Sequence, residues 1–315
     1  MSCSTLLATQ LKINALNVVR LDGVELFDVC RVFDCGQCFR FDPVSNSSHN
    51  VEYAGCAYGK YISIAQDKNT VYIYNSTVED FERLWMRFLS LDRDYAEINT
   101  NILSLSQNPA LADAVSSASG IRILKQDEWE SICSFIISQN NNIPRIKKLV
   151  AALCQACGSK IDVSLMQGHI ADAHMNDEMC VYSFPSPDSV AALGLDGLSA
   201  LKVGFRAKYI LDAAAKMSHG DIDTRLLSSH ESTEECVKLL CSVKGIGPKV
   251  ASCALLFGFA RLDAFPVDVW IKKVVEKYFD EDFDPRDLGK YAGIAQQYLF
   301  YYERYIQSKS EVNQA

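Results

Sequence analysis

The sequence predicts an α+β fold, with an N-terminal antiparallel β-sheet domain at residues 1–102 and a mostly α-helical body at residues 103–315. Two observations lead to this prediction. The first part of the chain contains short runs of β-branched and aromatic residues that are separated by turn residues. The second part repeats its apolar residues every three or four positions, which is the period of an amphipathic helix.

The β elements are predicted from alternating side chains. Residues 61–65 and 70–74 are β-rich runs, and Asp67-Lys-Asn69 between them predicts the turn of a hairpin. Cys38-Phe-Arg-Phe41 also alternates and is expected to be a strand that stops at the following Asp-Pro. Residues 81–90 then change to helical spacing, which closes the first domain.

The helices of the body are predicted from apolar stripes. They are expected at residues 129–138, 143–156, 188–193 and 206–217. Residues 158–187 carry Gly, His, Asp and two prolines, and we expect them to form a long loop.

Composition is that of a globular protein, with 49% hydrophobic and 22% charged residues. The longest apolar stretch, near residues 250–260, is far shorter than a membrane span. Residues 1–20 lack the basic flank and apolar core of a secretion signal. We therefore expect a soluble, intracellular monomer without membrane contact.

Charge and cysteine content restrict the possible partners. A net charge of −8 argues against nucleic acid, but a local positive face can still bind it. The 12 cysteines are scattered, and many lie in apolar runs, as is typical of buried free thiols. The two Cys-x-x-Cys pairs, at Cys35 and Cys154, lie too far apart to resemble a zinc site. We expect neither a metal nor a cofactor.

The most informative segment is a helix–hairpin–helix at residues 236–257. A helix ends near Cys241, and Gly245-Ile-Gly247 is expected to make a tight turn because both glycines permit a positive φ. Pro248 suits the first position of the next helix. The glycines leave backbone N–H groups bare for an anion, of which DNA phosphate is the usual one. An ordinary turn between two helices is the alternative that the glycines alone leave open.

Lys249 lies in the first turn of the second helix, where the helix dipole disfavours a cation. It is either a phosphate-binding or solvated lysine, or a nucleophile held uncharged. Keeping a lysine neutral near pH 7 costs roughly 4–5 kcal/mol. A helix end supplies at most about 2 kcal/mol, so desolvation in a pocket must supply the rest. Cys253, one turn later, faces the same pocket. Lys244 precedes the glycines and fits a phosphate contact better.

Asp268 ends the motif Phe265-Pro-Val-Asp and precedes an apolar helix through Tyr278. Its position is that of a helix N-cap. A capped and rigid carboxylate can also stabilise the positive charge that develops at a sugar carbon when a glycosidic bond breaks. The two roles are compatible.

The hairpin, the lysine after Gly-Pro and the Pro-Val-Asp motif resemble the helix–hairpin–helix DNA glycosylase superfamily, and the lysine resembles its bifunctional members. Further segments resemble 8-oxoguanine DNA glycosylase over most of the chain and in the right order. These segments are Gly36-Gln-Cys-Phe-Arg40, Asn140-Asn-Asn-Ile-Pro-Arg145, Gly204-Phe-Arg-Ala-Lys-Tyr209 and Gly293-Ile-Ala-Gln-Gln-Tyr-Leu-Phe300.

The resemblance implies a base excision repair enzyme without a cofactor. It would remove 8-oxoguanine from duplex DNA, opposite cytosine, through a Schiff base on Lys249 with Asp268 as its electrostatic partner. β-Elimination would follow. Such an enzyme would be cytoplasmic or nucleoid-associated in a bacterium and nuclear in a eukaryote.

The resemblance also assigns roles to individual residues. The Gly36 carbonyl would accept the N7–H that distinguishes 8-oxoguanine from guanine, and an unpaired acceptor would penalise the normal base. Gln296 would read the Watson–Crick edge, while Cys253 and Phe300 would sandwich the ring. The remaining assigned residues contact DNA: Asn140, Arg145 and Arg206 at the orphaned cytosine, Phe205 as a wedge, and Lys244, Gly245 and Gly247 at phosphates.

Three positions depart from the family pattern: Phe205 replaces a tyrosine, Trp270 a histidine and Phe257 a methionine. Two other functions stay open. One is a monofunctional glycosylase for another damaged base, in which Asp268 activates water. The other is a non-catalytic helix–hairpin–helix protein that binds DNA.

Overall fold

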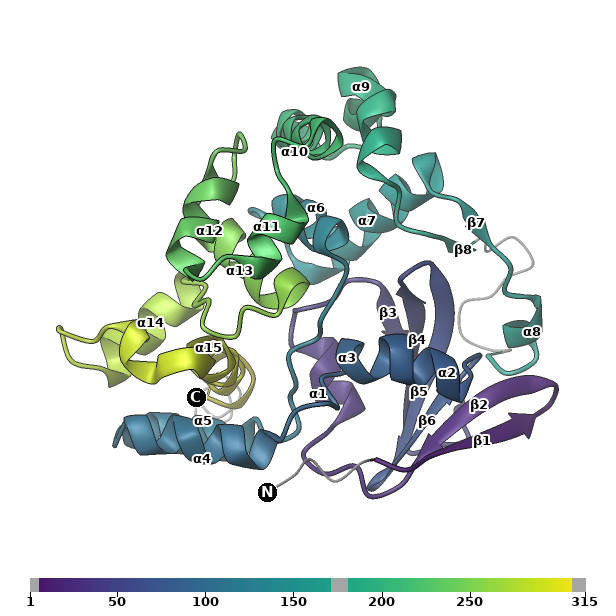
Figure 1. Cartoon of the computed structure of the whole chain (residues 1–315), viewed down its shortest axis with the longest axis horizontal. Helices are drawn as coiled ribbons and strands as arrows, with labels where there is room; N and C mark the ends of the chain where they lie inside the picture. Colours follow the sequence, from purple (N-terminus) through teal and green to yellow (C-terminus); the bar gives the residue numbers. More distant parts are fainter. Residues whose placement is uncertain (1–5, 171–180, 308–315) are drawn as a thin grey trace, which may run out of the picture.

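The computed structural model describes residues 6–170 and 181–307, and the predicted α+β architecture is confirmed (Figure 1). A six-stranded antiparallel sheet precedes the helical body, with its strands in the order β1-β2-β6-β5-β4-β3. The strands are β1 Ala8–Ile13, β2 Leu16–Leu21, β3 Phe41–Pro43, β4 Val51–Ala57, β5 Lys60–Asp67 and β6 Thr70–Tyr74.

The predicted hairpin is formed by β5 and β6, which pair in antiparallel register with Asp67 opposite Thr70 beside the turn. The turn residue Lys68 adopts a left-handed backbone with φ 54°. The predicted strand at residues 38–41 was largely wrong, because β3 begins only at Phe41. Before it, Phe39 packs edge-on against Phe135 of the helical body, with ring centroids 5.7 Å apart.

The sheet is covered on both faces because its side chains alternate. On one face, Ile62 and Ile64 of β5 pack with α1 (Val29–Asp34) and with the helical segment of α2 (Val78–Asp80), η1 (Phe81–Trp85) and α3 (Met86–Phe88). On the other face, Tyr61 and Ala65 pack against residues 163–170. This second cover includes the short helix α8 (Ser164–Gln167), which lies beside the sheet in Figure 1.

The helical body surrounds one large apolar core. Its α-helices are α4 Tyr95–Leu105, α5 Pro109–Ser117, α6 Glu128–Ser138, α7 Ile143–Cys157, α9 Pro187–Ala200, α10 Ala207–His219, α11 Thr224–Ser229, α12 Thr233–Cys241, α13 Pro248–Phe259, α14 Val269–Tyr278 and α15 Ala292–Tyr301. The 3₁₀ helices of the body are η2 Gly204–Arg206 and η3 Pro285–Tyr291, and η4 Tyr302–Gln307 is a π-helix. Within the described ranges, no helix has the length and apolar character needed to cross a membrane.

The long loop predicted at residues 158–187 is partly structured. It contains α8 and a two-stranded ladder of β7 (Lys160–Ile161) and β8 (Val181–Tyr182), while residues 171–180 of the prediction lie outside the described part. The predicted helix at 188–193 continues to Ala200 across a break at Gly194, where φ is 65°. A glycine can adopt that backbone without strain, so the chain bends there and resumes its helix.

The two cores are interleaved in sequence. Cys35 and Phe39, which follow α1, belong to the core of the helical body. Leu124, which precedes α6, belongs to the core of the sheet. A domain division at residue 102 therefore stays a prediction, and the segment after α1 becomes a wall of the site described next.

Candidate active site

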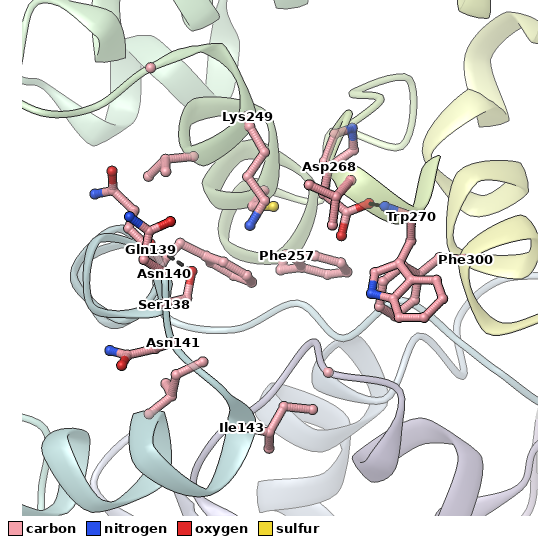
Figure 2. A pocket seen from close by; sticks show the side chains of 18 of the residues that line it. Ser138, Gln139, Asn140, Asn141, Ile143, Lys249, Phe257, Asp268, Trp270 and Phe300 are labelled. Carbon is pink, nitrogen blue, oxygen red and sulfur yellow. Dashed lines mark hydrogen bonds between the residues drawn. The ribbon is translucent and has the colours of Figure 1, made fainter. Parts of the chain in front are cut away.

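A cavity of about 760 Å³, here called the central cavity, opens where α6, α7, α13, α14 and α15 meet the segment after α1 (Figure 2). Every predicted site residue lines it except Lys244, Arg145 and Arg206. The lining includes Gly36, Phe135, Asn140, Phe205, Gly245, Gly247, Lys249, Cys253, Phe257, Asp268, Trp270, Gln296, Phe300 and Arg304.

The hairpin between α12 and α13 uses its two glycines differently. Gly245 has φ +81° and lies so close to the Tyr209 ring that any Cβ would overlap ring carbons. Gly247, expected to share this left-handed freedom, instead has an extended backbone with φ −96°. It is the N-cap of α13 and provides no side-chain cap, so the first N–H groups of that helix lack a side-chain acceptor. A bare helix N-terminus of this kind suits an anion.

Lys249 enters the central cavity from the first turn of α13. Its amine lies 5.7 Å from the centre of the Phe135 ring, and Figure 2 shows it directed into the cavity. Cys253, one turn later, is 4% exposed. Burial raises the pKa of its thiol, against an opposing effect of the nearby Lys249 amine. The thiol is therefore a neutral, apolar wall beside the amine at neutral pH.

Asp268 is the N-cap of α14, as predicted. Its Oδ1 accepts hydrogen bonds from the backbone N–H groups of Trp270, at 3.0 Å, and Ile271, at 2.9 Å. These two bonds fix the carboxylate, and Figure 2 shows it facing the same space as the Lys249 amine. The fixed position lets the group act on a charge that forms in the cavity without reorganising first.

The inner wall combines α15 with the segment after α1. Gly36 has φ +85°, a backbone conformation that favours glycine. The side chain of Gln297 fastens this segment to α15 by donating to the Cys35 carbonyl at 3.0 Å. On the same helix, Gln296 is 4% exposed, and its Oε1 has no hydrogen-bond partner in the described structure. A buried amide oxygen without a partner is costly, which points to a ligand that donates to it.

The opposite wall is the turn between α6 and α7. Asn140 is exposed with φ 50°, a left-handed backbone that asparagine tolerates. Arg206 lies beneath this turn and is 4% exposed. Its guanidinium donates to the Gln139 carbonyl, at 2.8 Å from Nε, and to the Asn140 carbonyl at 3.2 Å. In this structure the side chain therefore holds the turn, and a contact of Arg206 with cytosine stays a prediction.

The other predicted DNA contacts lie around the mouth. Phe205 is 51% exposed, with its ring edge-on to Tyr209 at 5.8 Å. Arg145 and Lys244 are exposed outside the cavity lining. The Lys244 backbone is fastened by its N–H, which donates to the Asp212 carboxylate at 2.7 Å.

Comparison with known proteins assigns both parts of the chain. Residues 20–132 match the model of the 8-oxoguanine DNA glycosylase N-terminal domain, and residues 133–287 match that of HhH-GPD superfamily base excision DNA repair proteins. A Clostridium acetobutylicum 8-oxoguanine glycosylase/lyase, solved with DNA containing cytosine opposite 8-oxoG, superimposes with a TM-score of 0.80. It is 34% identical, and the match covers 95% of this chain and 97% of that one. The chain belongs to the 8-oxoguanine DNA glycosylase family.

Two curated relatives agree with this assignment. An N-glycosylase/DNA lyase of Saccharomyces cerevisiae is 30% identical over 202 residues, which are 61% of this chain and 50% of the relative. The N-glycosylase/DNA lyase OGG1 of Arabidopsis thaliana is 28% identical over 292 residues, which are 85% of this chain and 75% of the relative. The match thus spans about half the length of the yeast protein.

Several lining residues of this family member were not predicted as site residues, among them Phe135, Trp270 and Arg304. Phe135 stacks on Phe257, with centroids 5.3 Å apart and an angle of 19°, and forms the floor under Lys249. Trp270 also lines the cavity, from the first turn of α14 that Asp268 caps (Figure 2). Arg304 lies over the Phe300 ring at 5.4 Å. Only Trp270 had a local signal, its departure from the family pattern, because the other two lie within ordinary helical spacing.

Within the described ranges, no group of three His, Cys, Asp or Glu side chains is placed to hold a metal ion.

Proposed function

We propose that this protein is a base excision repair enzyme, a bifunctional DNA glycosylase and abasic-site lyase that removes 8-oxoguanine opposite cytosine from duplex DNA. One observation carries the proposal: Lys249 and Asp268 face one cavity that also holds the unpaired amide oxygen of Gln296. The names of the Clostridium and Arabidopsis relatives supply the chemistry, glycosylase and lyase. The cavity supplies a place for an extruded purine.

Recognition of the base is proposed for the inner wall. The Gly36 carbonyl accepts N7–H of the oxidised base, and Gln296 pairs with its Watson–Crick edge. Cys253 and Phe300 hold the ring between them. Guanine has no N7–H, so it leaves the carbonyl unpaired, and a site built around a hydrogen bond rejects the base that lacks it.

The chemistry is proposed for Lys249 and Asp268. The neutral amine of Lys249 attacks C1′ of the sugar, the C1′–N9 bond breaks, and its electron pair leaves with the base. The Asp268 carboxylate stabilises the positive charge on the sugar in this step. Opening of the sugar ring gives a Schiff base on Lys249. Loss of a C2′ proton then expels the 3′ phosphate and nicks the strand.

The residues around the rim of the cavity are proposed to bind the DNA duplex. The N-terminus of α13, with Gly245, Gly247 and Lys244, binds phosphates. Phe205 wedges into the stack where the nucleotide has left. The unpaired cytosine is met by Asn140, Arg145 and Arg206. The enzyme acts as a monomer without a cofactor, inside the cell where the genome lies: the cytoplasm or nucleoid of a bacterium, or the nucleus of a eukaryote.

Borohydride trapping tests the proposal. Wild-type protein and Lys249→Gln are incubated with duplexes that carry 8-oxoguanine or other damaged bases, each opposite cytosine. We expect wild type to release 8-oxoguanine and to form a covalent adduct, and Lys249→Gln to do neither. The matched control Lys244→Gln removes a lysine of the same hairpin and should weaken binding while keeping the adduct.

Other outcomes identify the rival functions. Base release without an adduct in wild type would assign a monofunctional glycosylase that uses water. Duplex binding without release of any base would assign a non-catalytic DNA-binding protein.

A further inference from the structure

Three residues of the C-terminal helical segment form a stripe along the wall of the central cavity. Gln296, Phe300 and Arg304 follow one another at intervals of four residues, and all three line the cavity. Side chains at this spacing share one face of a helix. Gln296 is 4% exposed, whereas Phe300 and Arg304 are half-buried. The stripe therefore runs from the deep end of the cavity toward its mouth.

Arg304 is held at the mouth by aromatic rings. Its guanidinium carbon lies 5.4 Å from the centre of the Phe300 ring and 5.2 Å from that of Tyr305. Tyr305 is itself fixed, because its hydroxyl donates to the Asp34 carbonyl at 3.0 Å. Contacts with ring faces orient a guanidinium but leave its N–H donors available for an oxyanion.

The charge of Arg304 is not neutralised by the rest of the described chain. Over residues 6–170 and 181–307, no carboxylate forms an ion pair with it. Of the residues that line the cavity, Lys249 and Arg304 are basic and Asp268 is acidic. Lys249 and Asp268 face the same part of the central cavity. Arg304 is therefore a separate, permanent cation on the aromatic wall.

We propose that Arg304 is a positioning residue that binds a phosphate of the extruded nucleotide; this inference rests on the proposed function. A base that pairs with Gln296 and stacks on Phe300 brings its sugar and phosphates to the outer end of the same stripe. There the guanidinium can bind a phosphate through two parallel hydrogen bonds. Arg304 lies on the same wall of the cavity as the base site. Its contact with a phosphate therefore forms only after the nucleotide has left the DNA duplex. It therefore favours the extruded state over the stacked one.

The salt dependence of DNA binding tests this inference. Dissociation constants are measured over a range of KCl concentrations for two duplexes, one undamaged and one with a non-cleavable tetrahydrofuran abasic site opposite cytosine. For Arg304→Met, we expect affinity for the abasic duplex to fall by roughly tenfold or more. The slope of log K against log salt should become shallower by about one. Binding to the undamaged duplex should not change.

Two matched variants complete the experiment. Arg304→Lys keeps the charge and should keep the wild-type slope, with a smaller loss of affinity because lysine cannot bind bidentately. Arg87→Met removes an exposed arginine of α3, outside the cavity lining, and should change neither duplex. Unchanged binding of Arg304→Met to undamaged DNA also shows that this variant is folded.

Two results would overturn the inference. An unchanged slope for Arg304→Met would mean that no phosphate contact is lost, and any loss of affinity would then come from lost support of Phe300. An equal loss on both duplexes would mean that the contact does not depend on extrusion. Each of these leaves base release by wild type, and so the proposed function, intact, whereas failure of wild type to release any base would remove the proposed function itself.

Discussion

Gly245 packs directly against the ring of Tyr209, and no side chain fits between them. Tyr209 in turn lies edge-on to the exposed Phe205. The turn of the hairpin and the proposed wedge are thus parts of one packed unit. A change at residue 245 must move Tyr209, and with it Phe205.

The two glycines of the hairpin should respond differently to alanine. Gly245→Ala has two costs. The alanine must adopt a left-handed backbone, which costs about 1–2 kcal/mol, and its Cβ overlaps the Tyr209 ring. We expect it to lower the free energy of unfolding by at least about 2 kcal/mol and to weaken duplex binding. Gly247→Ala has an extended backbone and open space, so its unfolding free energy should change by under about 0.5 kcal/mol.

Urea denaturation of both variants, with fluorescence anisotropy for duplex binding, measures this difference. Equal unfolding midpoints for the two alanine variants would contradict the packing of Gly245 against Tyr209.

The features that the sequence predicted well are local. The position of Asp268 at an N-cap and of Lys249 in a first helical turn both follow from residues within a few positions of one another. The hairpin of β5 and β6 follows in the same way from its turn residues. Interactions between neighbouring residues determine these features, so they can be predicted from one sequence without an alignment.

The features that were missed depend on tertiary packing. Phe39 belongs to the helical core although its sequence neighbours alternate like a strand, and nothing local indicates that it contacts Phe135. Arg206 was predicted as a contact of the orphaned cytosine, and no local pattern indicated that its side chain is buried under the turn that carries Asn140. The stripe that ends at Arg304 becomes visible only when α15 is placed against the cavity.

Charge and capping at Asp268 can be separated by two substitutions. Asparagine caps a helix as well as aspartate, so Asp268→Asn should keep the bonds to Trp270 and Ile271 and the stability of the wild type. Asp268→Ala should lose about 1 kcal/mol of stability. Both variants should excise 8-oxoguanine at least about 100-fold more slowly, because both lack the carboxylate charge.

Single-turnover excision rates and thermal melting of the same preparations give the two readings. If Asp268→Asn excised the base at the wild-type rate, the carboxylate would be a cap only.

Gln296 is expected to lower the stability of the fold while contributing to recognition of the damaged base. Its buried Oε1 is unpaired, so Gln296→Met should raise the free energy of unfolding by about 1 kcal/mol while slowing excision of 8-oxoguanine. The neighbouring Gln297→Met is the matched control. It removes the bond to the Cys35 carbonyl, and should lower stability by about 1–3 kcal/mol. Chemical denaturation and excision assays on both variants measure these effects. Stability changes of the same sign in the two variants would contradict the prediction.

The Arg40–Glu130 pair, which joins the segment after α1 to α6, should make stability depend on pH. Its atoms are 3.3 Å apart and nearly inaccessible. Burial raises the pKa of Glu130 from 4.5 to about 7, although Arg40 opposes the shift. A carboxyl whose pKa is raised on folding binds its proton more tightly in the native state. Its stabilising contribution is complete below pH 4.5 and is lost as the pH rises through about 7.

Comparison with Glu130→Gln isolates this contribution, because all other titrating groups are common to both proteins. Between pH 4.5 and 8, the unfolding free energy of wild type should fall by about 3 kcal/mol relative to that of Glu130→Gln. Glu128→Gln, two residues earlier in a partly exposed ion pair with Lys125, removes a carboxylate of the same helix and is the matched control. Denaturation curves measured across this pH range test the prediction. If the unfolding free energies of wild type and Glu130→Gln ran parallel with pH, Glu130 would stay ionised throughout. The carboxylate would then be a permanent partner of Arg40 rather than a group that gains its charge near neutral pH.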